Sequence, residues 1–423
     1  MRNRFLLFAF SFILLFTACR KEADYIPYPG ENSKLAYSNY TEQFQYLWKI
    51  ISSGYVFWDV DTVDWDAAYD RYLPRFEALD RKYLDSGFVR TDELNELYLG
   101  LVGKMADHHM TFVVKNLHPA PTDASPLAIV RPGRLEVESR DYYIENRATA
   151  VAGIKAFLNG IEGTHTVTEH LASDALIQEF GVYVHYEYCL FTLADGRKVP
   201  YLWTDNAAIT PVMRDMPGSP AYMAINGWLN AICNTPRNQL AGIILDNRAN
   251  GGGYQDDLDY IVGTFINERT ELFKTRYKEG PGRLEYSAWC PYYQNPNPNY
   301  HRDITAENIP YVVLVDINSV SMAEIEPMTI KTVLPTAHVI GERTYGGTGP
   351  LQPDAVDLNY GAPFGDRNLY HHYVYTSTFE ALMLGRVCEG EGITPDEIVL
   401  RIADPAHSFQ PQLDAALQYI QTY

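Results

Sequence analysis

Apolar residues recur every three or four positions between about residues 39 and 117. In the stretch TEQFQYLWKIISSGY this spacing places four apolar side chains on one face of a helix, namely Phe44, Leu47, Ile50 and Ile51. The stretches DWDAAYDRYLPRFEALDRKYL and TDELNELYLGLVGKM continue the helical pattern. The pattern therefore predicts a helical N-terminal domain over residues 39–117.

Short strands and turns replace this pattern between residues 118 and 235. The stretch YVHYEYCLFTLADGRKVPYLW alternates large apolar and polar residues on both sides of Ala194-Asp195-Gly196, which indicates a β-hairpin. We therefore predict a β-rich middle segment over residues 118–235.

The residues from 236 to 423 have the alternation of an α/β fold. The apolar runs AGIILD, YVVLVD and HVIGE are short and bounded by turn residues, which is typical of buried strands. The stretches DDLDYIVGTFI and AEIEPMTIKTV lie between them and have a helical pattern. Alternating strands and helices predict a mainly parallel sheet covered by helices, which makes residues 236–423 an α/β core.

The first 19 residues form a separate unit. A start with Arg2 and Arg4, a short apolar run and the residues Thr17-Ala18-Cys19 are typical of a secretory signal. A cysteine directly after Thr-Ala resembles a bacterial lipobox, in which that cysteine receives a lipid. We predict a lipoprotein signal peptide over residues 1–19 and a polar tether over 20–38. The protein is then expected in the bacterial cell envelope, anchored through Cys19 on the periplasmic face or at the cell surface.

Charge and cysteine content narrow the possible functions. The net charge of −19, with no cluster of Lys and Arg, argues against nucleic-acid binding, which needs a basic surface. No cysteine and histidine cluster has the spacing of a zinc site. Four cysteines besides Cys19 permit disulfides in an oxidising compartment, but buried free thiols fit equally well. These four are Cys189, Cys233, Cys290 and Cys388.

Two stretches of the α/β core carry candidate chemistry. In ILDNRANGGG, three consecutive glycines after a strand allow another group to approach the backbone closely. In VLVDINSVSMAEIEPM, a pair of serines lies between a strand and a helix. A serine there faces out of the core, and the helix N-terminus stabilises negative charge on a substrate oxygen. Serine is also a common helix cap, so this stretch alone leaves both roles open.

Four motifs taken together resemble those of the tail-specific, or C-terminal processing, serine peptidase family. DNRANGGG, VLVDINSVSMAE, GERTYGGTG and GITPDEIV occur in the order and spacing of that family. The resemblance covers residues 239–401 well and 39–117 loosely. It implies a crotonase-like (Clp-like) α/β peptidase core behind a helical domain. It also implies hydrolysis of peptide bonds in a peptide or protein substrate through an acyl-enzyme, with no cofactor and no metal.

The resemblance assigns the nucleophile and the oxyanion hole. Ser321 stands three residues before Glu324, which is the place of the nucleophile, whereas Ser319 does not. The backbone N–H groups of Met322 and Gly252 would form the oxyanion hole. Bulk at the glycines would then block the substrate carbonyl.

The resemblance also implies which residue is the general base, because the sequence lacks the lysine that the Ser–Lys branch of the family uses. Gly347 stands where that branch has its lysine, and no lysine follows Lys331. The chain is more similar to the tricorn-protease branch, which uses a histidine. His109 in DHHMT matches that base, and His108 takes the place of an assisting serine.

The supporting residues are assigned in the same way. Glu389 is the orienting acid, with Glu391 as the second choice, and Asp107 braces the histidine turn. Asp246 and Arg248 are expected to form a structural ion pair beneath the glycine loop. An imidazole base with its ordinary pKa of about 6.5 predicts a rate that rises between about pH 5.5 and 7.5.

Two other functions stay open at this point. The first is a catalytically inactive lipoprotein with the peptidase fold that binds peptides or a hydrophobic ligand. The second is a glycan-binding lipoprotein, which the abundance of tyrosine allows. Residues 119–220 occupy the place where the family often has a PDZ domain, but they lack a Gly-Leu-Gly-Phe-like loop. Capture of a free peptide C-terminus is therefore not predicted.

Overall fold

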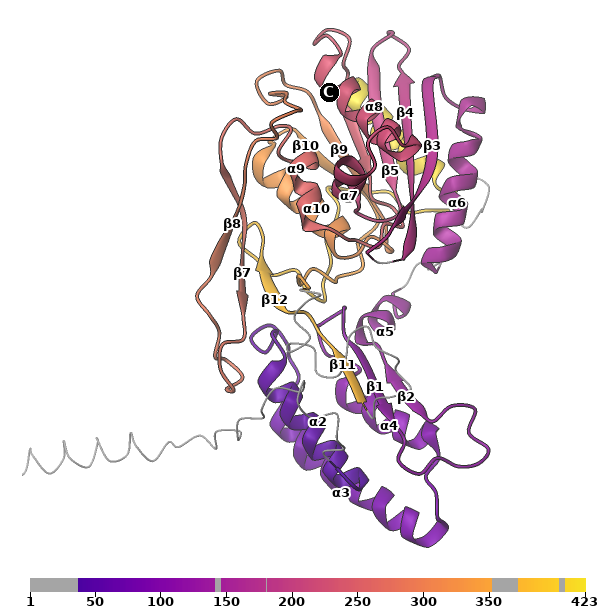
Figure 1. The fold of residues 1–423 in the computed structure, drawn as a ribbon, viewed down its shortest axis with the longest axis vertical. Helices are drawn as coiled ribbons and strands as arrows, with labels where there is room; N and C mark the ends of the chain where they lie inside the picture. Colours follow the sequence, from indigo (N-terminus) through magenta and orange to yellow (C-terminus); the bar gives the residue numbers. More distant parts are fainter. Residues whose placement is uncertain (1–36, 141–145, 180, 352–371, 403–407) are drawn as a thin grey trace, which may run out of the picture.

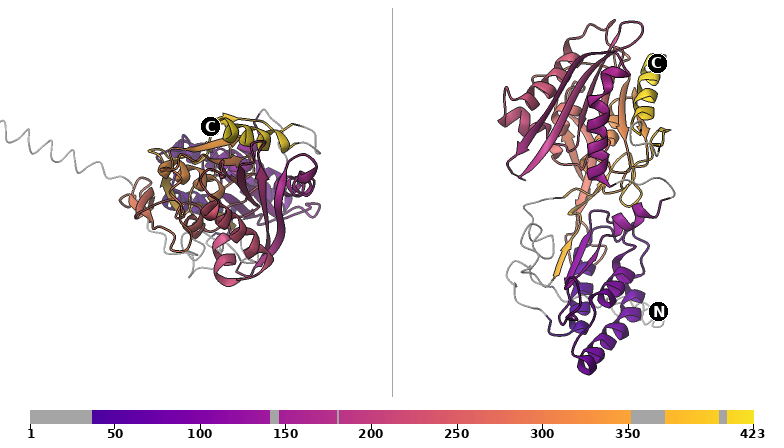
Figure 2. Two further views of the ribbon diagram at one scale, coloured as in Figure 1. Left: turned by 90° about the horizontal axis from the view of Figure 1, so that it is seen from above. Right: turned by 90° about the vertical axis from the view of Figure 1, so that its right-hand side faces the viewer.

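The computed structural model describes residues 37–140, 146–179, 181–351, 372–402 and 408–423. Cys19, the predicted signal peptide and most of the predicted tether lie outside the described residues. Figure 1 shows two lobes, with the N-terminal helices in the lower lobe and a large sheet in the upper lobe. In Figure 2 the C-terminal helix lies against the upper lobe, at the end of the molecule opposite to the N-terminal helices.

The N-terminal lobe contains the three helices that the hydrophobic spacing predicts, α2 (Tyr40–Gly54), α3 (Trp65–Ser86) and α4 (Thr91–Val102). Side-chain caps fix two of their starts, since Asn39 accepts a hydrogen bond from the Glu42 N–H at 2.8 Å and Asp64 accepts one from the Ala67 N–H at 3.0 Å. The four apolar residues predicted on one face of the first helix are all buried. The lobe also contains a strand, β1 (Thr111–Lys115), directly after the histidine turn. It pairs antiparallel with β2 (Leu127–Val130) and β11 (His372–Tyr375).

The upper lobe is built on one seven-stranded sheet with the order β13-β10-β9-β6-β5-β4-β3. The central strands β10, β9 and β6 run parallel, as the apolar runs predict, and all five residues of β9 are buried. The strands, in chain order, are β3 (Val167–Ile177), β4 (Val182–Thr192), β5 (Lys198–Thr204), β6 (Ile243–Asp246), β9 (Tyr311–Val315), β10 (Ala337–Gly341) and β13 (Glu397–Ile398).

Strands β3–β5 of the middle segment belong to this same sheet, whereas its strand β2 pairs with β1 of the N-terminal lobe. The predicted hairpin around Ala194-Asp195-Gly196 connects β4 and β5, and β5 pairs parallel with β6 of the core. The boundary predicted at residue 235 therefore does not coincide with a break in the sheet. The segment also contributes four helices, α5 (Pro132–Glu138), α6 (Arg147–Asn159), α7 (Ile209–Asp215) and α8 (Pro220–Asn234).

Helices cover both faces of the sheet. Apolar residues of α7, α8, α9 (Leu258–Ile261) and α10 (Met322–Val333) form a core on one face. Those of α6 and α11 (Gln410–Thr422) form a second core on the other. The described residues also include two short 3-10 turns, Ile161–Gly163 and Gln255–Asp257.

A smaller three-stranded sheet with the order β12-β7-β8 projects from the upper lobe. Its strands are β7 (Thr270–Tyr277), β8 (Cys290–Gln294) and β12 (Phe379–Leu382). Figure 1 shows β7 and β8 as a long hairpin whose tip lies beside the N-terminal helices.

The cysteines within the described residues are free thiols. Cys189 and Cys388 are buried, Cys233 is half-buried and Cys290 is exposed. The possibility of disulfides among these four is therefore not realised. Within the described ranges, no helix has both the length and the apolar character needed to span a membrane.

Candidate active site

Ser321 and Ser319 have different environments after strand β9. Ser319 is fully buried, and its hydroxyl donates to the Asn247 carbonyl at 2.6 Å and accepts the Asp316 N–H at 2.9 Å. Ser321 is half-buried at the N-terminal end of α10, with φ of 63° and ψ of −122°. A non-glycine residue adopts such a backbone only when its surroundings hold it there, and such strain is common at active sites. The geometry therefore separates a structural serine from an accessible one.

Glu324 holds the strained turn in place. Its buried carboxylate accepts hydrogen bonds from the N–H groups of Ser321 at 3.2 Å, Gly346 at 2.8 Å and Gly347 at 2.8 Å. The Thr344 hydroxyl donates to the same carboxylate at 2.5 Å. Burial raises the pKa of Glu324 to about 7, although the hydrogen bonds oppose this shift. The sequence indicated this glutamate only as the reference point for counting back to Ser321.

The glycine loop passes directly over Ser321. Gly252 has a φ of +80°, and a Cβ atom on it would lie 2.5 Å from Ser321 Cβ and 3.0 Å from the Met322 nitrogen. A side chain cannot fit there, as the sequence predicted. The Gly252 N–H, however, donates to Asn250 Oδ1 at 2.8 Å. It is engaged within its own loop, whereas the Met322 N–H has no acceptor among the described residues.

A buried ion pair supports the glycine loop from below. Arg248 and Asp246 are both fully buried, with 2.5 Å between Nη2 and Oδ2. Arg248 also donates to the Phe409 carbonyl at 2.6 Å and to Gln412 Oε1 at 3.1 Å, which ties the loop to the C-terminal helix. The expected structural role of this pair fits these contacts.

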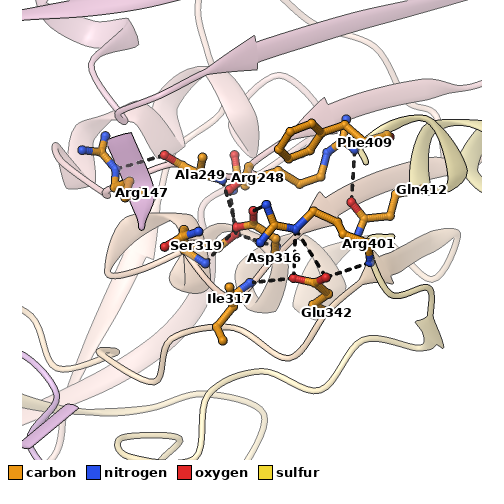
Figure 3. A network of polar contacts seen from close by, with 12 residues as sticks. Arg147, Arg248, Ala249, Asp316, Ile317, Ser319, Glu342, Arg401, Phe409 and Gln412 are labelled. Carbon is orange, nitrogen blue, oxygen red and sulfur yellow. Dashed lines mark hydrogen bonds and ion pairs between the residues drawn. The ribbon is translucent and has the colours of Figure 1, made fainter. Parts of the chain in front are cut away.

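Asp316 joins the glycine loop to the serine turn (Figure 3). Its Oδ1 atom accepts the N–H groups of Ala249 and Asn318, each at 2.9 Å. On the outer side of the loop, Arg147 Nε donates to the Ala249 carbonyl at 3.0 Å. Figure 3 also shows Arg401 beside Asp316, where it pairs with Glu342. The loop is thus fixed on both sides.

His109 reaches this site from the N-terminal lobe. A Cβ atom on Gly347 would lie 3.2 Å from His109 Cε1 and 3.0 Å from a methyl group of Val320. The Gly347 carbonyl accepts the Ser321 N–H at 3.0 Å. The His109 ring therefore lies beside Gly347, whose carbonyl binds Ser321, and a side chain at this position would crowd the imidazole.

A hydroxyl and two buried carboxylates surround the His109 ring. Its Nδ1 atom lies 3.5 Å from Ser377 Oγ, and this hydroxyl lies 3.1 Å from Asp107 Oδ1. Asp107 also accepts the N–H groups of His109 at 2.9 Å and Ser377 at 2.7 Å. Burial lowers the pKa of His109 to about 4 and raises the pKa of Asp107 to about 6. The imidazole is therefore neutral at pH 7, as a general base must be.

Glu389 lies close to His109 but bonds to the backbone around it. The side chains of Asp107, His109 and Glu389 each place one polar atom within 4.8 Å of the others. Oε1 of Glu389 accepts the His108 N–H at 2.8 Å, and Oε2 accepts the N–H groups of Thr348 and Gly349 at 2.6 Å. Burial raises the pKa of Glu389 well above its ordinary value. The alternative acid Glu391 is exposed.

The spacing of Asp107, His109 and Glu389 would also fit a metal ion. Both carboxylates, however, are turned toward N–H donors, which would repel a cation. The arrangement suits hydrogen bonding around an imidazole better than metal binding.

His108 contacts the loop before Gly347 and does not assist His109. Its Nδ1 atom lies 2.8 Å from the Tyr345 carbonyl, so Nδ1 carries a proton and donates it. The hydroxyl beside His109 belongs instead to Ser377, far along the chain. Sequence reasoning missed Ser377, because no spacing connects it with the histidine turn; the only signal was the polar run TST before an apolar stretch.

The sequence and the fold can now be compared with those of known proteins. Residues 221–399 match the sequence model of peptidase family S41. The matched residues make up less than half of the chain. The members of this family are serine-type peptidases, and this match gives the enzyme class of the protein as a serine-type peptidase. No curated protein sequence matches the chain significantly.

The crystal structures similar to this fold cover nearly the whole chain. A putative peptidase from Parabacteroides merdae is 21% identical over 91% of this chain and 97% of its own, with a TM-score of 0.61. Mature CPAF is 13% identical over 91% of this chain and 98% of its own, with a TM-score of 0.59. CPAF complexed with lactacystin is 12% identical over 91% and 97%, with a TM-score of 0.56. At these identities the similarity concerns the mixed α/β fold with its N-terminal helices.

Proposed function

We propose that the protein hydrolyses peptide bonds through an acyl-enzyme, with Ser321 as nucleophile and His109 as general base. The observation that carries this proposal is the position of Gly347, whose carbonyl accepts the Ser321 N–H and whose free side lies next to the His109 ring. The neutral imidazole and the strained, half-buried serine fit these roles.

The reaction follows from this geometry. His109 accepts the proton of Ser321 Oγ while Oγ attacks the substrate carbonyl carbon, and the carbonyl oxygen becomes negatively charged. The free Met322 N–H at the start of α10 donates to that oxygen. The Gly252 N–H contributes once it exchanges Asn250 Oδ1 for the substrate. His109 then gives its proton to the leaving amine, and a water molecule cleaves the resulting ester in the reverse sequence.

The groups behind the imidazole orient it and stabilise its positive charge. Ser377 and Asp107 lie on the Nδ1 side, which leaves Nε2 for the serine proton. We infer that Glu389 acts mainly through the backbone that it binds, since it holds His108 and Thr348 around the ring. Glu389 is thus an indirect orienting acid, and His108 braces the neighbouring loop.

Labelling with a fluorophosphonate probe tests the proposal. The probe should modify Ser321, as mapped by mass spectrometry, and both Ser321→Ala and His109→Ala should abolish or strongly slow the labelling. His108→Ala should weaken it only. Modification of Ser319, or undiminished labelling of the His109→Ala protein, would refute the assignment.

One contact favours a second candidate function. Because the Gly252 N–H is engaged by Asn250, the oxyanion hole has one free donor in this structure. A catalytically inactive protein that binds peptides or a hydrophobic ligand would have this property permanently. Wild-type protein that neither reacts with the probe nor cleaves fluorescent casein would support this alternative.

The location of the protein is proposed from the sequence alone. We propose a lipid at Cys19 that holds the protein to a bacterial membrane, with the peptidase facing the periplasm or the outside of the cell. We also propose that the sheet with its helices is the crotonase-like core that the motifs imply.

A further inference from the structure

The proposed catalytic groups come from different lobes. His109 lies in the N-terminal lobe before β1, whereas Ser321 lies in the upper lobe before α10. A displacement of about 1 Å between reacting groups can cost about a hundredfold in rate. Contacts that fix one lobe against the other therefore influence catalysis, provided that the proposed function holds.

One arginine of the β7–β8 hairpin lies between acidic residues of both lobes. Arg276 forms ion pairs with Asp59, in the loop between α2 and α3, and with Glu380 on β12. The rings of Tyr286 and Trp289 lie over its guanidinium at 4.1 and 4.4 Å. Only 16% of the Arg276 side chain is exposed, and Glu380 is fully buried. A planar group held by two carboxylates and two rings has a well-defined position.

The Asp59 side of this bridge leads to the histidine turn. Asp59 belongs to a short loop whose other residues bind the backbone just before His109. The Tyr55 hydroxyl accepts the Asp107 N–H at 3.1 Å and donates to Asp61 at 2.8 Å. Asp61 in turn accepts the Ala106 N–H at 2.9 Å.

The Glu380 side leads to the same turn by a second route. Glu380 is paired with Arg276 in the register of β12 and β7. Three residues earlier in the chain, Ser377 binds Asp107 through both its N–H and its hydroxyl. The Ser377 hydroxyl is also the group nearest to His109 Nδ1.

We propose that Arg276 is a positioning residue for the reaction, because its one guanidinium ties together the two segments that hold Asp107 and His109. The β7–β8 hairpin would thus hold the imidazole of His109 in place. Arg276 itself does not touch the reacting atoms.

Kinetic comparison of four variants of the full-length protein tests this role. Arg276→Gln removes the bridge, Arg276→Lys keeps the charge without the planar fork, and Asp59→Asn weakens only the exposed side. We expect the second-order rate constant for fluorophosphonate labelling to fall about ten- to a hundredfold in Arg276→Gln. Arg276→Lys and Asp59→Asn should lie between this variant and the wild type. Arg269→Gln is the matched control, because Arg269 precedes the same hairpin and lies over Tyr293 at 4.0 Å.

A pH profile separates positioning from a general loss of folded protein. Once the lobes loosen, water reaches His109, and its pKa should move up from about 4 toward the free value of about 6.5. Labelling by Arg276→Gln should therefore decline on acidification at a higher pH than labelling by the wild type. If Arg276→Gln lowers the labelling rate by the same factor at every pH, the loss reflects only a smaller folded fraction and the proposal is wrong. The proposal is also wrong if both Arg276→Gln and Asp59→Asn label at the wild-type rate.

These variants distinguish failure of the positioning role of Arg276 from failure of the proposed function. If His109→Ala keeps the wild-type labelling rate, the assignment of the base is wrong. If His109→Ala is inert while the Arg276 variants match the Arg269→Gln control, only the positioning role is wrong.

Discussion

Gly347 lies between the two residues that we propose as base and nucleophile, His109 and Ser321. Any side chain at this position would meet the His109 ring and Val320 at 3.0 to 3.3 Å, so these neighbours would have to shift to admit one. The same backbone also contacts the serine, because the Gly347 carbonyl accepts the Ser321 N–H. The absence of a side chain at Gly347 thus leaves the space that the His109 ring needs in the proposed site.

Gly252 is expected to be equally sensitive to substitution. Gly252→Ala should lower the rate of labelling and of casein cleavage by about 10²–10³, because the added methyl group displaces Ser321 or the Met322 donor. Gly196→Ala is the control: Gly196 has a similar φ of +86°, but a Cβ atom there meets nothing within 4 Å. Both variants carry similar backbone strain, and thermal unfolding should show an additional loss of stability only in Gly252→Ala, because of the clash with Ser321. Equal activity of the two would place the oxyanion hole elsewhere.

The pH dependence predicted from an ordinary histidine needs correction. Burial lowers the pKa of His109 to about 4, so protonation inactivates the base only as the pH falls through that value. The rate constant of labelling should change less than about threefold between pH 7.5 and 5.5, whereas a free imidazole with a pKa of 6.5 would lose about tenfold. Measurement across pH 4–8 checks this.

Asp107 provides the internal control for this profile. Its pKa of about 6 places a second titration within the measured range. A small inflection near pH 6 that disappears in Asp107→Asn belongs to this carboxyl group. A tenfold inflection near 6.5 that persists in Asp107→Asn would show that the His109 ring is more hydrated than the structure indicates.

At the scale of elements, the hydrophobic pattern predicted the local structure well. The helical spacing of Phe44, Leu47 and Ile50 predicts one helix, and the short apolar run of β9 predicts one strand. Both patterns arise because one face of the helix and both faces of the strand are buried. The position of Ser321 followed from the strand before it and the helix after it. Such features depend on neighbours in the chain.

Contacts between distant segments could not be predicted in this way. Ser377 reaches His109 from a segment 268 residues away, and no periodicity links the two. The sequence also gave no sign that Asn250 would accept the Gly252 N–H, or that β3–β5 would extend the core sheet. These long-range contacts depend on which strand edges and loops lie next to each other in the folded protein. Packing of the whole chain determines this arrangement.

The ion pair beneath the glycine loop predicts a large effect on stability. Arg248→Met leaves the buried Asp246 carboxylate without its partner, which typically costs about 3–5 kcal/mol. Urea unfolding should show this loss in the free energy of unfolding. Arg197→Met is the control, because Arg197 pairs with the half-exposed Asp195 in the β4–β5 turn and should barely change the midpoint. A similar midpoint for both variants would mean that Asp246 is neutralised in another way.

At the scale of the whole molecule, the proposed active site requires residues from both lobes. The N-terminal lobe supplies His109 and the upper lobe supplies Ser321, the glycine loop and Glu389. The family match over residues 221–399 lies mostly in the upper lobe and contains the proposed nucleophile but not the proposed base. The similar crystal structures span both lobes, so the fold they share with this chain includes both.

The predicted lipid anchor is also a property of the whole molecule, because it would determine where this peptidase meets its substrates. Thr17-Ala18-Cys19 predicts that Cys19 carries acyl chains after removal of the signal peptide. Two or three chains, at about 0.8 kcal/mol per buried CH₂ group, suffice for stable membrane attachment.

The full-length protein produced in a bacterium should therefore sediment with membranes, and mass spectrometry should find a lipid-modified N-terminal cysteine. Cys19→Ser should release the protein into the soluble fraction or leave it unprocessed and without lipid. Cys290→Ser, which changes an exposed thiol of the folded part, should behave like the wild type. If the Cys19→Ser protein is processed and still sediments with membranes, attachment depends on another part of the molecule and the lipid anchor is refuted.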